Sequence, residues 1–82
     1  MKEEHHLFRA VLLINTEIGS ESDVIKNLMK IKGVQNAYPC YGVYDVIAEI
    51  KHKTIDGLKE IVTWQVRKID NVRSTLTMII VK

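Results

Sequence analysis

One short stretch near the middle of the chain carries the residue types best suited to holding a small polar ligand. Tyr41, Gly42, Tyr44 and Asp45 follow one another closely, so aromatic rings surround a single carboxylate. Apolar walls with one well-placed charged group are typical of small-molecule sites. The same pattern fits an ordinary hairpin with a solvated turn at Gly42, in which Asp45 would bind nearby backbone amides. The spacing alone leaves both interpretations open.

Other residues that could do chemistry lack partners at a useful spacing. His5 and His6 are adjacent, but no further ligand follows them at a spacing typical of a metal site. His52 has no neighbouring nucleophile. The loop at residues 15–19 contains no arginine for a phosphate, carries an acid at Glu17, and lacks a Cys-x-x-Cys metal motif. We therefore expect no enzyme, no metal site and no cofactor, and we expect the single Cys40 to be a small buried filler.

The bulk composition limits the classes of function. The chain has 82 residues, of which 46% are apolar and 27% charged, which is typical of one small globular domain. No apolar run approaches the ~20 residues of a membrane span, and the acidic start does not resemble a signal peptide. A single cysteine favours a cytoplasmic protein. The net charge of +2 is spread along the sequence, so we expect no direct binding to nucleic acid or membrane.

Six predicted elements position the central stretch. Aliphatic and β-branched runs predict four strands, at residues 8–16, 34–41, 44–52 and 72–81. Apolar residues at helical spacing predict two helices, with Ser20 and Thr54 as their N-caps. The first helix is expected to stop at Gly33 and the second at Asn71. Leu58, Val62 and Val66 belong to the predicted buried stripe of the second helix, which also includes Ile55 and Ile69.

The order of these elements predicts the fold. Strand, helix, strand is followed by a second strand, helix, strand, and a faint internal repeat aligns Gly19 with Gly57 and Val24 with Val62. Two interleaved β-α-β units form an α+β, ferredoxin-like βαββαβ sandwich, with a four-stranded antiparallel sheet and two helices on one face. We expect residues 1–7 to be a flexible N-terminal tail and residues 8–82 to be a single domain.

Two helices can cover only one face of such a sheet. The other face is expected to expose an apolar patch of several hundred Å², larger than a monomer usually tolerates. We assign to this patch Val11, Leu13, Ile47, Ile79 and Val81. The patch predicts a homodimer in which the bare faces pack together. Trp64 falls opposite the buried stripe of the second helix, and either anchors a subunit contact or lies on the surface beside Lys or Arg.

Two motifs resemble the effector-binding domain of the Lrp/AsnC family of transcriptional regulators, also called the RAM domain. The family's Gly-x-aromatic-Asp turn at the head of the third strand matches Gly42, Tyr44 and Asp45. Its (Gly/Asn)-Val-x-x-Thr-x-Thr entry to the last strand matches Asn71, Val72, Thr75 and Thr77. The resemblance spans nearly the whole chain. It implies a dimer formed by sheet packing, dimers joined into a ring-like oligomer, and an amino-acid effector held between dimers.

The resemblance also implies a set of ligand-binding residues: Tyr41, Gly42, Tyr44, Asp45, Ser74, Thr75 and Thr77. Asp45 can accept hydrogen bonds from the effector's ammonium group. Backbone N–H groups around Gly42, together with the hydroxyl of Ser74 or Thr75, can donate to its carboxylate. Tyr41 and Tyr44 would form the walls.

The chain departs from the family pattern at its start. Full-length members carry a helix-turn-helix DNA-binding domain and a linker strand before this domain, whereas here about seven residues precede the first predicted strand. We therefore expect an effector-binding and oligomerisation domain that modulates transcription or amino-acid metabolism through assembly, without binding DNA. Two alternatives remain. One is a structural partner that co-assembles with full-length regulators and binds no ligand, and the other is a small ferredoxin-like enzyme.

Overall fold

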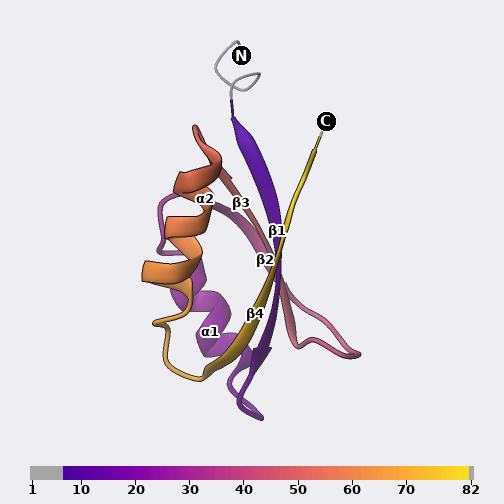
Figure 1. Cartoon of the computed structure of the whole chain (residues 1–82). Coiled ribbons are helices and arrows are strands. Elements are labelled where there is room, and N and C mark those ends of the chain that lie inside the picture. Colours follow the sequence, from indigo (N-terminus) through magenta and orange to yellow (C-terminus); the bar gives the residue numbers. More distant parts are fainter. Residues whose placement is uncertain (1–6, 82) are drawn as a thin grey trace.

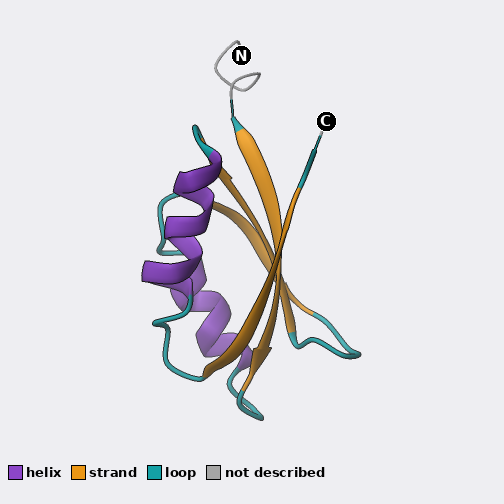
Figure 2. Ribbon diagram, viewed as in Figure 1, coloured by secondary structure: helices purple, strands orange, loops and turns teal. Residues whose placement is uncertain are grey.

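Hydrophobic strands and amphipathic helices form in the predicted order, but the first helix ends at Leu28 and the second at Val66, before the predicted stops at Gly33 and Asn71. The computed structural model describes residues 7–81 and forms one twisted sheet with two helices against one face (Figures 1 and 2). The elements are β1 (Phe8–Thr16), α1 (Glu21–Leu28), β2 (Val34–Pro39), β3 (Val46–His52), α2 (Ile55–Ile61) with its π-helical continuation (Val62–Val66), and β4 (Val72–Ile79). The predictions for residues 1–6, including His5 and His6, lie outside the described residues.

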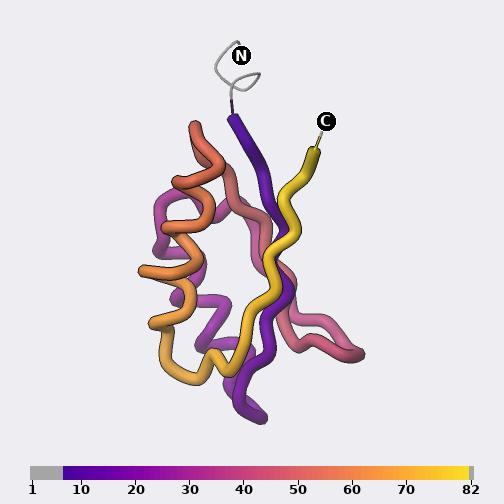
Figure 3. The backbone as a smooth tube through the Cα atoms, in the orientation of Figure 1, coloured from indigo at the N-terminus to yellow at the C-terminus, as the bar shows by residue number. Residues whose placement is uncertain are grey.

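The four strands form a sheet in the order β2-β3-β1-β4, with each neighbouring pair antiparallel. The predicted ferredoxin-like βαββαβ sandwich is confirmed. The backbone trace shows the start of β1 beside the end of β4, and the β2–β3 connection projecting from the opposite end of the sheet (Figure 3). None of the helices within residues 7–81 is long and apolar enough to cross a membrane.

Alternation along the central strands produces the core. Ala10, Leu12 and Ile14 of β1 are fully buried and point towards the helices. Period-two alternation puts every second residue of a strand on the same face, and burial of one large aliphatic side chain stabilises a fold by about 1.5–3 kcal/mol. The remaining buried apolar residues come from all the other elements except β4: Val24, Leu28, Val34, Val46, Ala48, Ile50, Leu58, Ile61, Val62 and Val66. Ile55, the first residue of α2, is exposed instead.

The two helix starts differ in how they are capped. At α2 the Thr54 hydroxyl accepts a hydrogen bond from the Gly57 backbone N–H at 2.8 Å, as the sequence predicts. Ser20 holds the corresponding position before α1, but its hydroxyl donates to the Glu17 carbonyl at 2.6 Å and caps no helix amide. Ser20 therefore fixes the β1–α1 connection, where the sequence predicts an N-cap.

Replacing Thr54 by Ala is expected to lower the free energy of unfolding by about 1 kcal/mol, because one helix amide loses its only side-chain acceptor. Thr54→Ser retains the hydroxyl, so its free energy of unfolding is expected to fall by only a small fraction of that amount. Chemical denaturation of both variants measures the difference. Equal losses in the two variants would show that the cap bond contributes nothing.

The connection between β2 and β3 is longer than the tight turn that the sequence predicts. β2 ends at Pro39 and β3 begins at Val46. The Cys40 backbone N–H donates to the Asp45 carbonyl at 2.9 Å, which closes the loop, and Gly42 has φ +133°, a conformation that favours glycine. Cys40 is half-buried, not fully buried as expected, and its thiol donates to the Tyr44 carbonyl at 3.3 Å.

The sheet face away from the helices is bare and apolar at its centre. Leu13 lies opposite Ile47 on β3 and Leu76 on β4, while Val11 lies opposite Met78. Leu76 and Met78 are about half exposed. We call these five residues the bare face. The assignment of Ile79 to this face is wrong, because Ile79 pairs with Ala10 and packs against the core on the helix side. Val81 lies beyond the end of β4 and is not part of it either.

Trp64 lies on the solvent side of the π-helical segment, with 63% of its surface exposed. The Lys68 ammonium lies 5.0 Å from the centre of the indole ring, within the range of a cation–π contact. Of the two predicted environments for Trp64, the single chain shows the surface pairing with a lysine.

Candidate functional site

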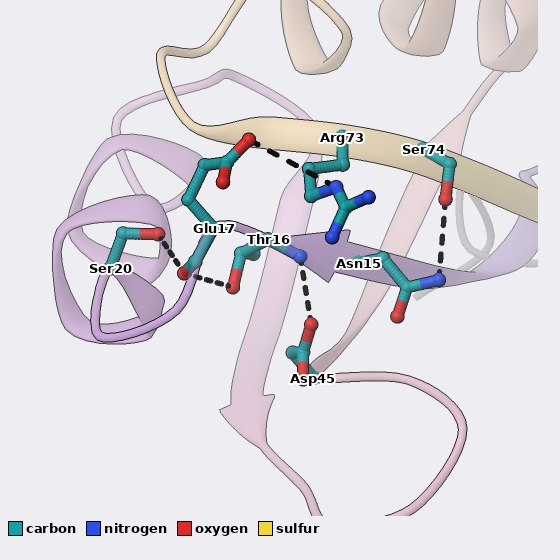
Figure 4. Close-up of polar contacts among 7 residues, drawn as sticks. All are labelled: Asn15, Thr16, Glu17, Ser20, Asp45, Arg73 and Ser74. Atoms are coloured by element: carbon teal, nitrogen blue, oxygen red, sulfur yellow. Dashed lines mark hydrogen bonds and ion pairs between the residues drawn. The ribbon is translucent and has the colours of Figure 1, made fainter.

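Asp45 is held in place where the end of β1 meets the start of β3. Its Oδ2 accepts a hydrogen bond from the Thr16 backbone N–H at 2.9 Å (Figure 4). Its own N–H donates to the Ile14 carbonyl at 2.9 Å. β1 and β3 are antiparallel, so the residue that precedes β3 necessarily reaches the last residues of β1. The carboxylate is half-buried, and within residues 7–81 its Oδ1 accepts no hydrogen bond. One oxygen thus fixes the orientation of Asp45 and the other can accept a ligand donor.

A hollow of about 340 Å³ beside Asp45 brings together opposite charges. It is lined by Asn15, Asp45, Arg73 and Ser74. Asn15 and Ser74 are register partners on β1 and β4, and the Asn15 amide donates to the Ser74 hydroxyl at 3.3 Å. The Arg73 guanidinium lies 3.9 Å from the Glu17 carboxylate (Figure 4), and because both side chains are largely exposed this ion pair is weak. A carboxylate and a guanidinium in one hollow complement the two charges of a zwitterion.

Sequence reasoning missed Asn15 and Arg73. Both residues could have been identified from the sequence by pairing the predicted strands. Asn15 is a polar residue near the end of a mostly apolar strand, and Arg73 comes directly before Ser74, one of the predicted ligand-binding residues. In a sheet where β1 and β4 are antiparallel neighbours, the end of one strand meets the start of the other. Pairing the predicted strands would therefore have placed both residues beside Asp45.

A second hollow, of about 440 Å³, lies on the other side of Asp45. Among its lining residues are Tyr41, Gly42 and Cys40 from the β2–β3 connection, and Glu21 and Ser22 from the start of α1. The Tyr41 side chain is fully exposed. A Cβ atom built on Gly42 would meet nothing within 4 Å. In the single chain, glycine is therefore favoured at this position by its positive φ and not by a close approach of neighbouring atoms. Tyr44 is half-buried and lines neither hollow.

Thr75 and Thr77 lie on the opposite face of the sheet from Ser74. Thr75 pairs with Ile14 and Thr77 with Leu12, whose side chains face the helices. Both threonines line a hollow of about 360 Å³ between β4 and α2. A further hollow of about 340 Å³ at the start of β4 shares Arg73 and Ser74 with the Asp45 hollow, and Thr75 with the threonine hollow. The structure thus groups Asp45 with Tyr41, Gly42 and Ser74, and separates them from Thr75 and Thr77.

The sequence matches one protein family over almost its full length. The model of the Lrp/AsnC ligand binding domain matches residues 9–82. The chain is 30% identical over 73 residues to the HTH-type transcriptional regulator FL11 of Pyrococcus abyssi. This alignment covers 89% of the chain and 48% of FL11, so the chain spans about half the length of this curated relative.

Solved structures share the fold. The hypothetical protein PHS023 from Pyrococcus horikoshii superposes with a TM-score of 0.84 at 32% identity, over 92% of this chain and 90% of that one. The transcriptional regulator NMB0573 from Neisseria meningitidis, crystallised as a complex with L-Met, superposes with a TM-score of 0.86 over 100% of this chain and 55% of that one. At 13% identity the second likeness shows the fold alone. The family match confirms the predicted resemblance: the chain belongs to the family of Lrp/AsnC ligand binding domains.

Proposed function

We propose that this domain, which we take to span residues 8–82, binds an amino-acid effector beside Asp45 and passes its presence on through self-assembly. One observation carries the proposal. The Asp45 carboxylate is fixed by the Thr16 N–H, keeps one oxygen available, and lines the same hollow as the Arg73 guanidinium. A zwitterion would place its ammonium at Asp45 and its carboxylate at Arg73, with hydrogen bonds from Asn15 or Ser74. No catalytic step is part of this proposal.

The comparisons support this class of ligand. The family is a ligand-binding domain, and NMB0573, which shares the fold, was crystallised with L-Met. The hollow beside Asp45, of about 340 Å³, falls within the range of ~300–1,000 Å³ typical of small-molecule sites.

Assembly is the second half of the proposal. The bare face offers Leu13 at its centre, with Ile47 and Leu76 on the two neighbouring strands. A two-fold symmetric dimer would bury the same patch on both chains. The exposed Tyr41 ring beside Asp45 is then available to a neighbouring dimer in a larger ring. Such a ring would cover a site that is open in the single chain.

A co-assembly role without a ligand is the second candidate. It is favoured by the bare face together with the similarity to FL11, an HTH-type transcriptional regulator. A full-length regulator with a similar sheet face would be the partner. In that case the domain would change which oligomers the regulator forms. Both proteins would then be in the cytoplasm.

A thermal-shift screen of the twenty amino acids separates the two candidates. An amino acid in 100-fold excess over its Kd is expected to stabilise the folded protein by about 2.7 kcal/mol, which raises the midpoint of unfolding by about 10 °C or more. Stabilisation by one amino acid or a chemically related group supports effector binding. No shift with any of the twenty at millimolar concentration contradicts it and favours the co-assembly role.

A further inference from the structure

The bare face carries an ion pair beside its apolar centre. Arg9 and Glu49 lie on the two central strands, β1 and β3, and the Arg9 Nη1 is 3.5 Å from the Glu49 Oε2. Glu49 is the register partner of Val11, a member of the bare face, and Arg9 precedes Val11 by two residues on the same strand. Because every second residue of a strand shares a face, both charged side chains lie on the side away from the helices.

This ion pair is open to solvent in the single chain. The Arg9 side chain is 46% exposed and the Glu49 side chain 31%. Exposed ion pairs contribute little to the stability of a fold, because water screens both charges. The contact uses one N–H of the guanidinium and one oxygen of the carboxylate, and within residues 7–81 neither side chain makes a further hydrogen bond. Both side chains can therefore bind additional partners.

A sheet packed on the bare face would cover this ion pair. Val11 belongs to the patch that the proposed dimer buries, and Glu49 stands directly opposite Val11 on the neighbouring strand. A charge that an interface takes out of water without a partner weakens the complex strongly. The bare face therefore fits a surface that offers an acid and a base at matching positions.

A second copy of this chain meets that requirement in one arrangement. In a two-fold dimer of sheets with aligned strands, residue i of one chain contacts residue j of the other, and j contacts i. An axis that runs along the strands, between β1 and β3, lays β3 of each chain over β1 of the other at the same level. Glu49 of each chain then lies over Val11 of the other, next to the other chain's Arg9. The two ion pairs merge into a closed ring of alternating charges.

An axis that runs across the strands does not satisfy these charges. Placed through the centre of the bare face, it lays β3 over β3 and exchanges the level of Glu49 with that of Ile47. Each carboxylate of Glu49 would then face an aliphatic side chain of the other chain. With the axis along the strands, Lys51 comes to lie over the other chain's Arg9, and its long stem can carry the ammonium to the solvated rim.

We infer that Arg9 and Glu49 make the bare face specific for a second copy of this chain, through a ring of ion pairs between the two chains. The inference rests on the assembly half of the proposed function, and it specifies the partner and the direction of the two-fold axis. An unlike sheet without an acid and a base at these positions would leave both charges buried and unpaired.

Charge reversal in separate chains tests the contact between chains. Arg9→Glu places only acids in the ring and Glu49→Arg only bases, so we expect the dimer Kd of each variant, measured by sedimentation equilibrium, to rise roughly tenfold or more. An equimolar mixture of the two variants brings opposite charges together across the interface, and the mixed dimer should recover a Kd within about threefold of the wild type. With one variant labelled with ¹⁵N, native mass spectrometry distinguishes the mixed dimer from the two homodimers. An ion pair that acted only within each chain would give no recovery on mixing.

Lys26→Glu and Glu60→Arg are the matched controls. They reverse the same two charges at exposed positions on α1 and α2, in the helix layer and away from the bare face. Both variants should dimerise as the wild type does and show no preference for the mixed dimer. Circular dichroism of all four variants confirms that each is folded.

The outcomes separate this inference from the proposed function. A wild-type dimer whose Kd is unchanged by both reversals at Arg9 and Glu49, or losses that mixing does not recover, would overturn the inference and leave sheet-face assembly intact. A wild-type protein that stays monomeric at micromolar concentration would overturn the assembly half of the proposed function as well, and would leave the bare face to an unlike partner.

Discussion

Leu13→Lys is expected to convert a self-associated protein into a monomer without unfolding it. Leu13 lies at the centre of the bare face, between Ile47 and Leu76, and points away from the helices and the core. In a two-fold dimer the substitution introduces two lysines at the same interface. Taking an unpaired ammonium out of water costs several kcal/mol, so we expect the dimer Kd to rise roughly 100-fold or more. Light scattering at micromolar concentration measures the mass.

Ile18→Lys is the matched control. Ile18 is also aliphatic, carries the same change of charge when replaced, and is fully exposed in the β1–α1 connection. It should leave the mass of the particle unchanged. A wild-type protein that is a monomer at this concentration would contradict sheet-face assembly. So would a dimer that tolerates Leu13→Lys as well as it tolerates Ile18→Lys.

Asp45→Asn is expected to abolish effector binding while the fold survives. The amide oxygen of Asn can still accept the Thr16 N–H, which lies 2.9 Å from Asp45 Oδ2, so the structural bond is retained. The negative charge that would bind an ammonium is lost. We expect the free energy of unfolding to fall by less than about 1 kcal/mol and the ligand-induced thermal shift to disappear.

Asp45→Ala distinguishes the two roles of this side chain. It removes the acceptor as well as the charge and leaves the Thr16 N–H without its partner, so the free energy of unfolding should fall by about 1–2 kcal/mol more than in Asp45→Asn. Glu60→Gln, which removes an exposed carboxylate from α2, controls for the change in net charge. An effector that still stabilises Asp45→Asn as strongly as the wild type would exclude Asp45 as the ammonium acceptor.

The architecture was predictable because the pattern of apolar residues is unambiguous. Continuous aliphatic runs mark β1 and β4, alternation marks β3, and helical spacing marks both helices. The errors are local and have a common cause. The sheet face on which a residue near a strand end lies depends on how its strand is aligned with the neighbouring strand. The observed register pairs Ile79 with Ala10, so Ile79 lies on the helix side. The hydrogen bond from Cys40 to Asp45, which sets the length of the β2–β3 connection, is equally invisible in the residue pattern.

The candidate site was only partly predictable. The resemblance of the Gly-x-aromatic-Asp turn to the family motif singles out Asp45 and Gly42 as candidates, and in the structure both line one hollow. Ser74 and Thr75 are consecutive in a strand, so their side chains must point to opposite faces, and alternation could have separated them in advance. Arg67 lines the same hollow as Thr75 and Thr77. Regular α-helical periodicity could not have placed it there, because the π-helical turn before it changes its angular position on the helix.

The most direct test of effector binding at Asp45 is a titration followed by two-dimensional ¹H–¹⁵N NMR. The Thr16 amide proton points at Asp45 Oδ2, so an ammonium group that binds the same carboxylate must change its chemical shift. With the amino acid selected by the thermal screen, we predict saturable shifts of the Thr16 and Ser74 amides. The amide of Gly33, which precedes β2 and whose carbonyl accepts the Lys51 N–H near the far end of β3, stays unchanged. Saturation of the protein without a change at Thr16, or shifts confined to the region of Gly33, would contradict the proposed site.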